Sequence, residues 1–146
     1  MKWIVGGVIA ALFGLIISLF FRLQAFKPVL LETQQVPEMK LIFKNHLGPY
    51  YKIVPTIEEV EKYVRANGET CELSFGEYLD DPDKEDQDRL RSIGGCLTGK
   101  AWENLPTDYL QKTIPPRFTL IAHFSGAPSI GPYKVYPKAA DWMKEN

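Results

Sequence analysis

The side chains best suited to acid–base or nucleophilic chemistry are few in this sequence. Its two histidines are His46 and His123, and Ser125 lies close to the second of them. A serine hydrolase of the common type would show a G-x-S-x-G turn and a metalloprotease an H-E-x-x-H helix, and neither pattern occurs. We therefore predict that the protein is not an enzyme, has no catalytic residue and needs no cofactor.

A group of carboxylates between Asp80 and Asp88 invites comparison with a calcium-binding loop. The spacing D-x-[DN]-x-[DN]-G that such a loop needs is absent. We expect a solvated acidic loop and no metal site.

The two cysteines, Cys71 and Cys96, are not spaced as a C-x-x-C motif, which argues against a metal or redox motif. We favour two buried free thiols, because free cysteine behaves as a small apolar residue. A disulfide stays open as the alternative, and it would indicate an oxidising compartment.

Aromatic side chains make binding a stronger candidate than catalysis. Aromatic-rich concavities are the usual form of small-molecule sites. We predict a groove that takes a hydrophobic small molecule, lined by Phe43, Tyr50, Tyr78, Trp102, Phe124, Tyr133 and Trp142.

One segment favours a different function, that of an adaptor or receptor that contacts other proteins at a membrane. Trp102-Glu103-Asn104-Leu105 fits the W-x-x-L core of a peptide-docking motif. The preceding Gly99-Lys100-Ala101 lacks the acidic flank of such motifs, so this remains the alternative.

The first element that the sequence predicts is a membrane anchor. Residues 3–21 contain no charge and no proline, and as a helix they would extend roughly 28 Å, about the thickness of the bilayer's hydrocarbon core. No small-x-small cleavage site follows, which favours a transmembrane helix over a signal peptide. We predict a single-pass anchor over 1–23, a stalk over 24–37 and a soluble domain over 38–146 that faces the cytoplasm.

The soluble domain shows alternating strand and helix patterns. Strands are expected over 40–46, 71–75, 94–99 and 118–124, and a helix follows Thr56, with Glu59 completing a capping box. Asn67-Gly68 is a typical helix end.

Two parts of the domain resemble each other. Gly48-Pro49-Tyr50 recurs as Gly131-Pro132-Tyr133, each after a strand and before a segment with a proline-led helix. We expect two equivalent strand-breaking turns that face one shared groove. The second copy ends inside its helix, so we expect either a fragment or a homodimer in which a second chain supplies strands.

These motifs resemble the GyrI-like domain family. The likeness is carried by His46-Leu47-Gly48-Pro49-Tyr50, by Tyr78-Leu79-Asp80-Asp81-Pro82 and by the segment from Leu90 to Cys96. The layout with an anchor is similar to a membrane-bound subgroup that includes an ER-phagy receptor. The resemblance implies an α+β fold of two strand-helix-strand-strand repeats, the second incomplete, and a non-enzymatic binding module, with a small hydrolase as a further alternative.

The charge of the chain is close to balanced. Its net charge is -1, and no basic stripe is visible along the sequence. A protein that reads phosphates would be expected to carry one, so we predict no nucleic-acid partner.

Overall fold

The computed structural model describes residues 2–146, with the side chains of residues 6–9 and 11–146. The chain divides into two compact units, which we describe separately. Unit 1 comprises the residues up to Gln35 together with Phe118–Asn146, and unit 2 comprises Val36–Arg117.

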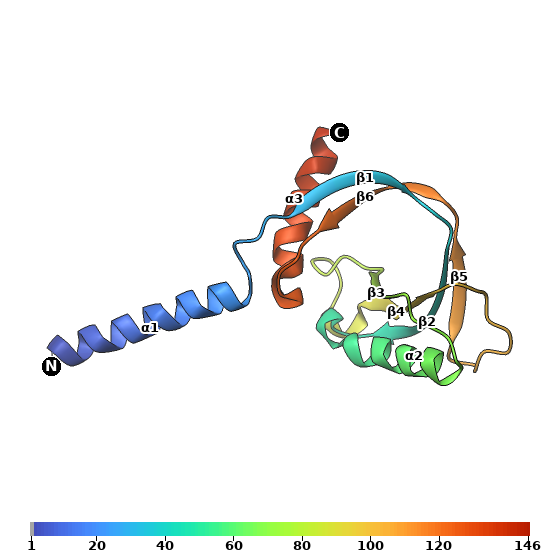
Figure 1. The fold of residues 1–146 in the computed structure, drawn as a ribbon, viewed down its shortest axis with the longest axis horizontal. Helices are drawn as coiled ribbons and strands as arrows, with labels where there is room; N and C mark the ends of the chain where they lie inside the picture. Colours follow the sequence, from blue (N-terminus) through green and yellow to red (C-terminus); the bar gives the residue numbers. More distant parts are fainter. Residues whose placement is uncertain (1) are drawn as a thin grey trace. The chain divides into compact units, whose positions relative to one another are not determined.

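Unit 2 is a four-stranded sheet with one helix against it (Figure 1). Its elements are β2 (Met39–Leu47), a 3₁₀ turn η1 (Tyr50–Lys52), α2 (Val54–Ala66), β3 (Leu73–Tyr78), η2 (Gln87–Arg89), β4 (Arg91–Thr98) and β5 (Leu110–Ile114). The strand order is β3-β4-β2-β5, and every neighbouring pair is antiparallel. The edge strands are therefore β3 and β5.

The two faces of this sheet carry different apolar clusters, because successive side chains of a strand point to opposite faces. On one face Ile42 and Cys96 pack against Val60 and Val64 of α2, and all four are fully buried. The apolar positions at helical spacing in α2 explain this contact. The opposite face carries a second cluster around Leu41, Phe43 and Ile93.

Glycines mark the chain before and after α2. Gly48 has φ +123° and Gly68 has φ +76°, both in the region that favours glycine. The helix begins without a side-chain cap, with Ile53 at the N-cap position. The predicted capping box at Thr56 is therefore wrong: Thr56 lies within the first turn, and its hydroxyl is 3.5 Å from Nδ1 of His46.

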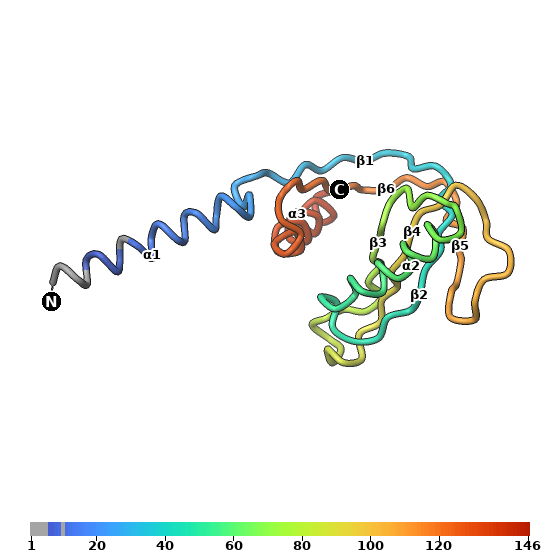
Figure 2. The backbone as a smooth tube through the Cα atoms, turned by 60° about the horizontal axis from the view of Figure 1, so that its bottom comes forward, coloured from blue at the N-terminus to red at the C-terminus, as the bar shows by residue number. Residues whose placement is uncertain are grey.

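Unit 1 contains α1 (Lys2–Arg22), β1 (Leu30–Val36), β6 (Arg117–His123), η3 (Pro128–Ile130) and α3 (Gly131–Glu145). The strands β1 and β6 form a two-stranded sheet and run side by side in Figure 2. Within α3, Pro137 occupies an interior position. The predicted stalk over 24–37 thus contains a strand.

The predicted transmembrane anchor requires correction. Residues 3–21 do lie in a helix, α1, but the side chains of residues 3–5 and 10 lie outside the described residues. Among the described residues, no helix has both the length and the apolar character needed to cross a bilayer. The membrane part of the predicted fold class, and the single-pass location with a cytoplasmic domain that rested on it, are not supported.

The two Gly-Pro-Tyr segments follow different backbone paths, contrary to the predicted repeat. Gly48-Pro49 forms an extended turn, with Pro49 at φ -56° and ψ 131°. Gly131 has φ -50° and ψ -55° and already belongs to α3. The same three residues make a strand-breaking turn in one place and the first turn of a helix in the other.

The cysteines are bonded, so the prediction of two free thiols is wrong. Cys71 and Cys96 form a disulfide with a Cα–Cα distance of 5.3 Å, and no free cysteine remains. The sequence did not reveal this because the pair becomes close only through the fold of β3 onto β4.

Candidate functional site

The seven aromatic residues predicted to line a groove are divided between the two units. In unit 2, Phe43 (8% exposed) and Trp102 (9% exposed) belong to clusters on opposite faces of the sheet. Of the four predicted residues in unit 2, Tyr50 and Tyr78 are brought together, with ring centroids 4.5 Å apart.

The other three predicted residues lie in unit 1. Tyr133 is 82% exposed on α3. Phe124 is half-buried beside Lys134, whose Nζ lies 5.0 Å from the ring centroid, and Trp142 is half-buried. No contact between aromatic rings joins these three among the described residues.

The best-defined polar arrangement surrounds Asp80, and we call it the Asp80 clasp: Tyr50, Tyr78, Asp80 and Arg91. Arg91 binds the Asp80 carboxylate with its guanidinium, with Nη2 2.6 Å from Oδ1, and with its backbone N–H, 2.6 Å from Oδ2. The Tyr50 hydroxyl donates to the Asp80 carbonyl at 2.7 Å and accepts from the Asp80 N–H at 3.0 Å. The clasp joins η1, the end of β3 and the start of β4.

Replacing Tyr50 with phenylalanine is expected to destabilise unit 2 by about 1–2 kcal/mol. The variant keeps the ring that contacts Tyr78 but leaves the backbone N–H and carbonyl of Asp80 without their hydrogen bonds to the hydroxyl. Urea unfolding followed by tryptophan fluorescence measures the change. As a control, Tyr51→Phe should be silent, because Tyr51 is largely exposed; equal losses in the two variants would contradict the role of the Tyr50 hydroxyl.

Ion pairs give unit 2 a predictable response to acid. Hydrogen bonds from Arg91 lower the pKa of Asp80. In the same way, Lys84 lowers the pKa of Asp81 and Lys44 lowers the pKa of Asp108. A lowered carboxyl pKa contributes stability above the pKa of the unfolded state, and this contribution is lost as the pH falls through the folded pKa.

We therefore expect the urea midpoint to be level from pH 7 to about 5 and to fall below about pH 4, the ordinary aspartate range. In Asp80→Asn the urea midpoint should decrease less over this acid range than in the wild type. Asp86→Asn is the matched control, because the Asp86 carboxylate makes no ion pair among the described residues. A midpoint that falls equally in wild type and Asp80→Asn would contradict the assignment.

A second cluster, the aromatic cluster, consists of Tyr63, Trp102 and Tyr109 on the α2 side of the sheet. The Tyr63 ring centroid lies 5.6 Å from that of Trp102 and 4.4 Å from that of Tyr109. Burial raises the pKa of the Tyr109 hydroxyl. These rings form a continuous packed group.

Lys44 borders the aromatic cluster and ties three segments together. Its Nζ lies 2.6 Å from Asp108, 2.6 Å from Glu59 and 5.0 Å from the Tyr109 ring centroid. The bonds to Asp108 and Glu59 raise the pKa of Lys44, so its charge is fixed in this position. This is the chemistry of a structural ion pair, since a general base would have to be uncharged.

The proposed W-x-x-L docking motif is built into the core. Trp102 Nε1 donates to Thr98 Oγ1 at 3.3 Å, and its backbone N–H and carbonyl are bonded to the Gln111 side chain at 2.9 and 2.8 Å. Leu105 packs against the same cluster. A docking motif must offer its tryptophan to a partner, and this one is enclosed.

Unit 2 also has a shallow hollow of about 390 Å³ beside the start of β2. It is lined by Val36, Pro37, Glu38, Met39, Lys40, Glu72, Leu97, Thr98 and Gly99. None of the seven predicted aromatic residues is among them. The hollow is bordered by carboxylates as well as apolar groups, and Lys40 lies 3.8 Å from Glu38.

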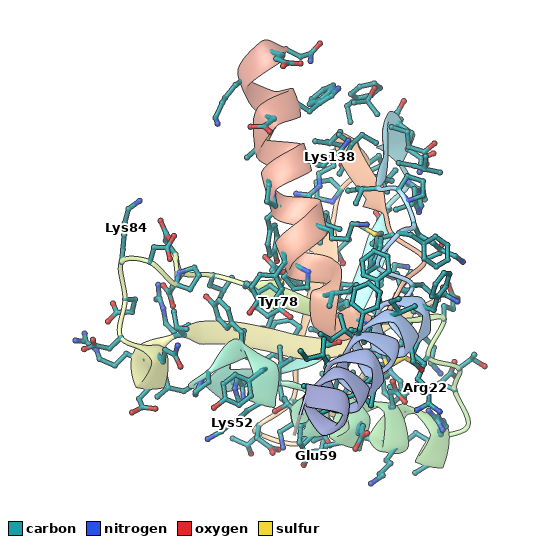
Figure 3. The ribbon with its side chains drawn as sticks, turned by 90° about the vertical axis from the view of Figure 1, so that its left-hand side faces the viewer. Arg22, Lys52, Glu59, Tyr78, Lys84 and Lys138 are labelled. Atoms are coloured by element: carbon teal, nitrogen blue, oxygen red, sulfur yellow. A yellow bond between two sulfur atoms is a disulfide. The ribbon has the colours of Figure 1, made fainter. Side chains whose placement is uncertain are left out.

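Charge is distributed unevenly between the units. Unit 1 contains six basic and three acidic residues, whereas unit 2 contains eleven basic and fifteen acidic residues. Eight basic residues of unit 2 form ion pairs: Lys40, Lys44, Arg65, Lys84, Arg89, Arg91, Lys100 and Lys112. Figure 3 shows Lys84 extending from the acidic loop, where it binds Asp81. The net charge of -1 is thus the sum of the charges of a basic and an acidic unit.

Comparison with known proteins gives likeness of fold but no sequence family. No protein-family model and no curated protein matches this chain. A cryo-EM structure of an EcmrR–DNA complex in EcmrR-RPo is similar at TM-score 0.62 and 14% identity, over 98% of this chain and 56% of the EcmrR chain. A crystal structure of the EcmrR C-terminal domain is similar at TM-score 0.60 and 17% identity, over 81% of this chain and 76% of that one. This chain therefore spans little more than half of the longer EcmrR chain.

These findings correct three predictions. The GyrI-like resemblance is not upheld, because no family model matches and the similar solved structures are those of EcmrR. The membrane-tethered small-molecule module lacks its membrane helix among the described residues. The exclusion of nucleic acid rested on net charge, and it is overturned by a similar chain that is seen in a complex with DNA.

The sequence pointed to the residues of the Asp80 clasp but not to the pairing of Arg91 with Asp80. All four residues lie in the quoted motifs, Arg91 within the segment from Leu90 to Cys96, but nothing in the spacing assigns Arg91 as the partner of Asp80. Antiparallel pairing brings these two together, since Tyr78 is opposite Ser92 in the register.

Proposed function

We propose that this chain is a regulatory domain that works in a complex with DNA. The observation that carries the proposal is the likeness to EcmrR in its DNA complex, which covers 98% of this chain and so includes nearly all of α1. The remaining part of the EcmrR chain has no counterpart in these 146 residues.

Direct contact with DNA is expected from unit 1 rather than unit 2. Phosphate contacts require lysine and arginine side chains that are free to replace counterions. Most basic side chains of unit 2 already bind carboxylates, whereas Lys138 on α3 is exposed and makes no ion pair among the described residues (Figure 3).

Fluorescence anisotropy of a labelled duplex titrated with the full chain tests this proposal. We expect weak binding, with Kd of about 10⁻⁶ to 10⁻⁴ M. The logarithm of the binding constant should fall linearly with the logarithm of the salt concentration. Lys138→Glu should weaken binding and reduce the salt slope by about one. The matched control is Lys84→Glu in unit 2, which should leave binding unchanged; no salt-dependent binding, or equal losses in the two variants, would refute the proposal.

The proposed role is non-enzymatic. His46 Nε2 lies 3.3 Å from the Pro49 carbonyl, and His123 Nε2 lies 2.8 Å from Glu32 in an exposed pair. Neither arrangement places a base at about 2.6–3.2 Å from a serine or cysteine nucleophile. An ester-hydrolysis assay in which His46→Ala and His123→Ala match the wild type would support this.

A further inference from the structure

The disulfide fixes one end of an edge strand. β3 pairs with β4 alone, and its half-buried Phe75 packs against the cluster around Leu41, Phe43 and Ile93. At its far end the Asp80 clasp secures the chain to β4 and η1. At its near end the covalent bond joins Cys71 to Cys96, a fully buried residue of the central strand β4.

The other links at the near end of β3 are exposed. Ser74 donates to Glu61, and Lys100 pairs with Glu69, both on the surface. The backbone N–H of Glu72 donates to the Leu97 carbonyl at 3.0 Å. Exposed pairs of this kind contribute little to stability, so the disulfide is the one strong link at this end among the described residues.

The chain leaves the β-ladder in order to form this bond. Leu73 pairs with Leu97, and continuing that register would place Cys71 opposite Gly99. Instead the chain bends at Glu72 and Cys71 is bonded to Cys96. The bond therefore anchors the connection between α2 and β3 to the apolar cluster under α2.

We propose that the Cys71–Cys96 disulfide is a redox-controlled lock on β3, so that reduction releases this strand while α2 and the remaining sheet stay folded. A small dithiol attacks the sulfur of Cys71, the less buried residue of the two, and Cys96 leaves as the thiolate. The second thiol of the reductant then displaces Cys71. Two electrons and two protons pass to the protein, which gains two thiols, and the dithiol becomes a disulfide.

The consequence is a controlled sheet edge. Release of the Leu73 end of β3 uncovers the N–H and C=O groups of β4 that now pair with it there, and an uncovered edge is a site where another strand can add. The α2 side remains held because Val60, Val64 and Ile42 stay packed around the Cys96 thiol. This inference is independent of the proposed DNA-associated role.

Hydrogen exchange measured by mass spectrometry, with and without dithiothreitol, tests the lock. We expect amides of β3 to exchange at least about tenfold faster after reduction, while α2 stays within about twofold, since local openings need not involve the whole unit. The increase should be largest near Leu73 and smallest near Tyr78, where the clasp persists. Cys71→Ser without reductant should match the reduced wild type and should not respond to dithiothreitol.

Two results would overturn the proposal. Unchanged exchange in β3 after complete reduction, verified by alkylation of both thiols, would show that the bond does not hold the strand. An equal increase in α2 and β3 would show a bond that stabilises all of unit 2 rather than a lock. Tyr50→Phe with the disulfide intact is the matched control, and it should speed exchange at the Tyr78 end instead.

Discussion

Replacing Gly95 with alanine is expected to destabilise unit 2 by about 3 kcal/mol or more. Gly95 lies in β4 opposite Phe43 of β2 and Phe75 of β3. A Cβ at this position would meet the Ile42 carbonyl oxygen at 2.0 Å and the Phe43 Cα at 2.7 Å. Both obstacles are backbone atoms of a central strand, so relief requires the strands to separate.

Urea unfolding of Gly95→Ala against wild type measures this cost. The matched control is Gly76→Ala in β3, where the new Cβ would meet the terminal Cδ1 of the Ile53 side chain, not backbone, at 3.3 Å. That variant should change stability by less than about 1 kcal/mol. If Gly95→Ala were as stable as Gly76→Ala, the close approach of β2 and β4 described here would be wrong.

Trp102→Ala is expected to cost about 3–5 kcal/mol, the range for loss of a large buried ring. The ring is buried on the α2 side of the sheet, contacts the Tyr63 ring in a tilted arrangement and donates from Nε1 to Thr98. Removal leaves a cavity in the aromatic cluster. Differential scanning calorimetry and urea unfolding at neutral pH give two independent measures of the lost free energy of unfolding.

Two further variants separate packing from hydrogen bonding at this position. Trp102→Phe keeps much of the ring and loses the Nε1 donor, so its cost should be smaller, about 1–2 kcal/mol. Tyr51→Ala, at a ring that is 74% exposed, should cost less than about 0.5 kcal/mol. A small loss in Trp102→Ala would show that the ring is accessible and would revive the docking motif.

Local patterns predicted the elements with strong periodicity. Alternation around Leu41 and Phe43 predicts a strand over 40–46, and the structure has β2 at Met39–Leu47. The apolar positions of α2 and Gly68 predict a helix that ends where Asn67 begins the turn. These signals succeed because burial on one face dictates the period.

Elements whose environment is set by distant residues were missed. β1 and β5 are short edge segments with little burial, and their sequences, LLETQQV and LQKTI, show no clear alternation. The same applies to the site: Arg91 and Asp80 meet through the antiparallel pairing of β3 with β4, and Cys71 meets Cys96 where the chain bends before β3. A repeated triplet misled the prediction, because Gly-Pro-Tyr fits both a turn and the start of a helix.

Pro137 divides α3 into two segments that are not equally constrained. Proline has no amide hydrogen, so the carbonyl of Tyr133, four residues earlier, receives no bond along the helix axis. Tyr133 is largely exposed, so water can hydrogen-bond to its carbonyl in place of the missing N–H. The second half of α3, which carries Lys138, therefore follows a missing hydrogen bond in the helix. We expect its orientation to vary more than that of an uninterrupted helix.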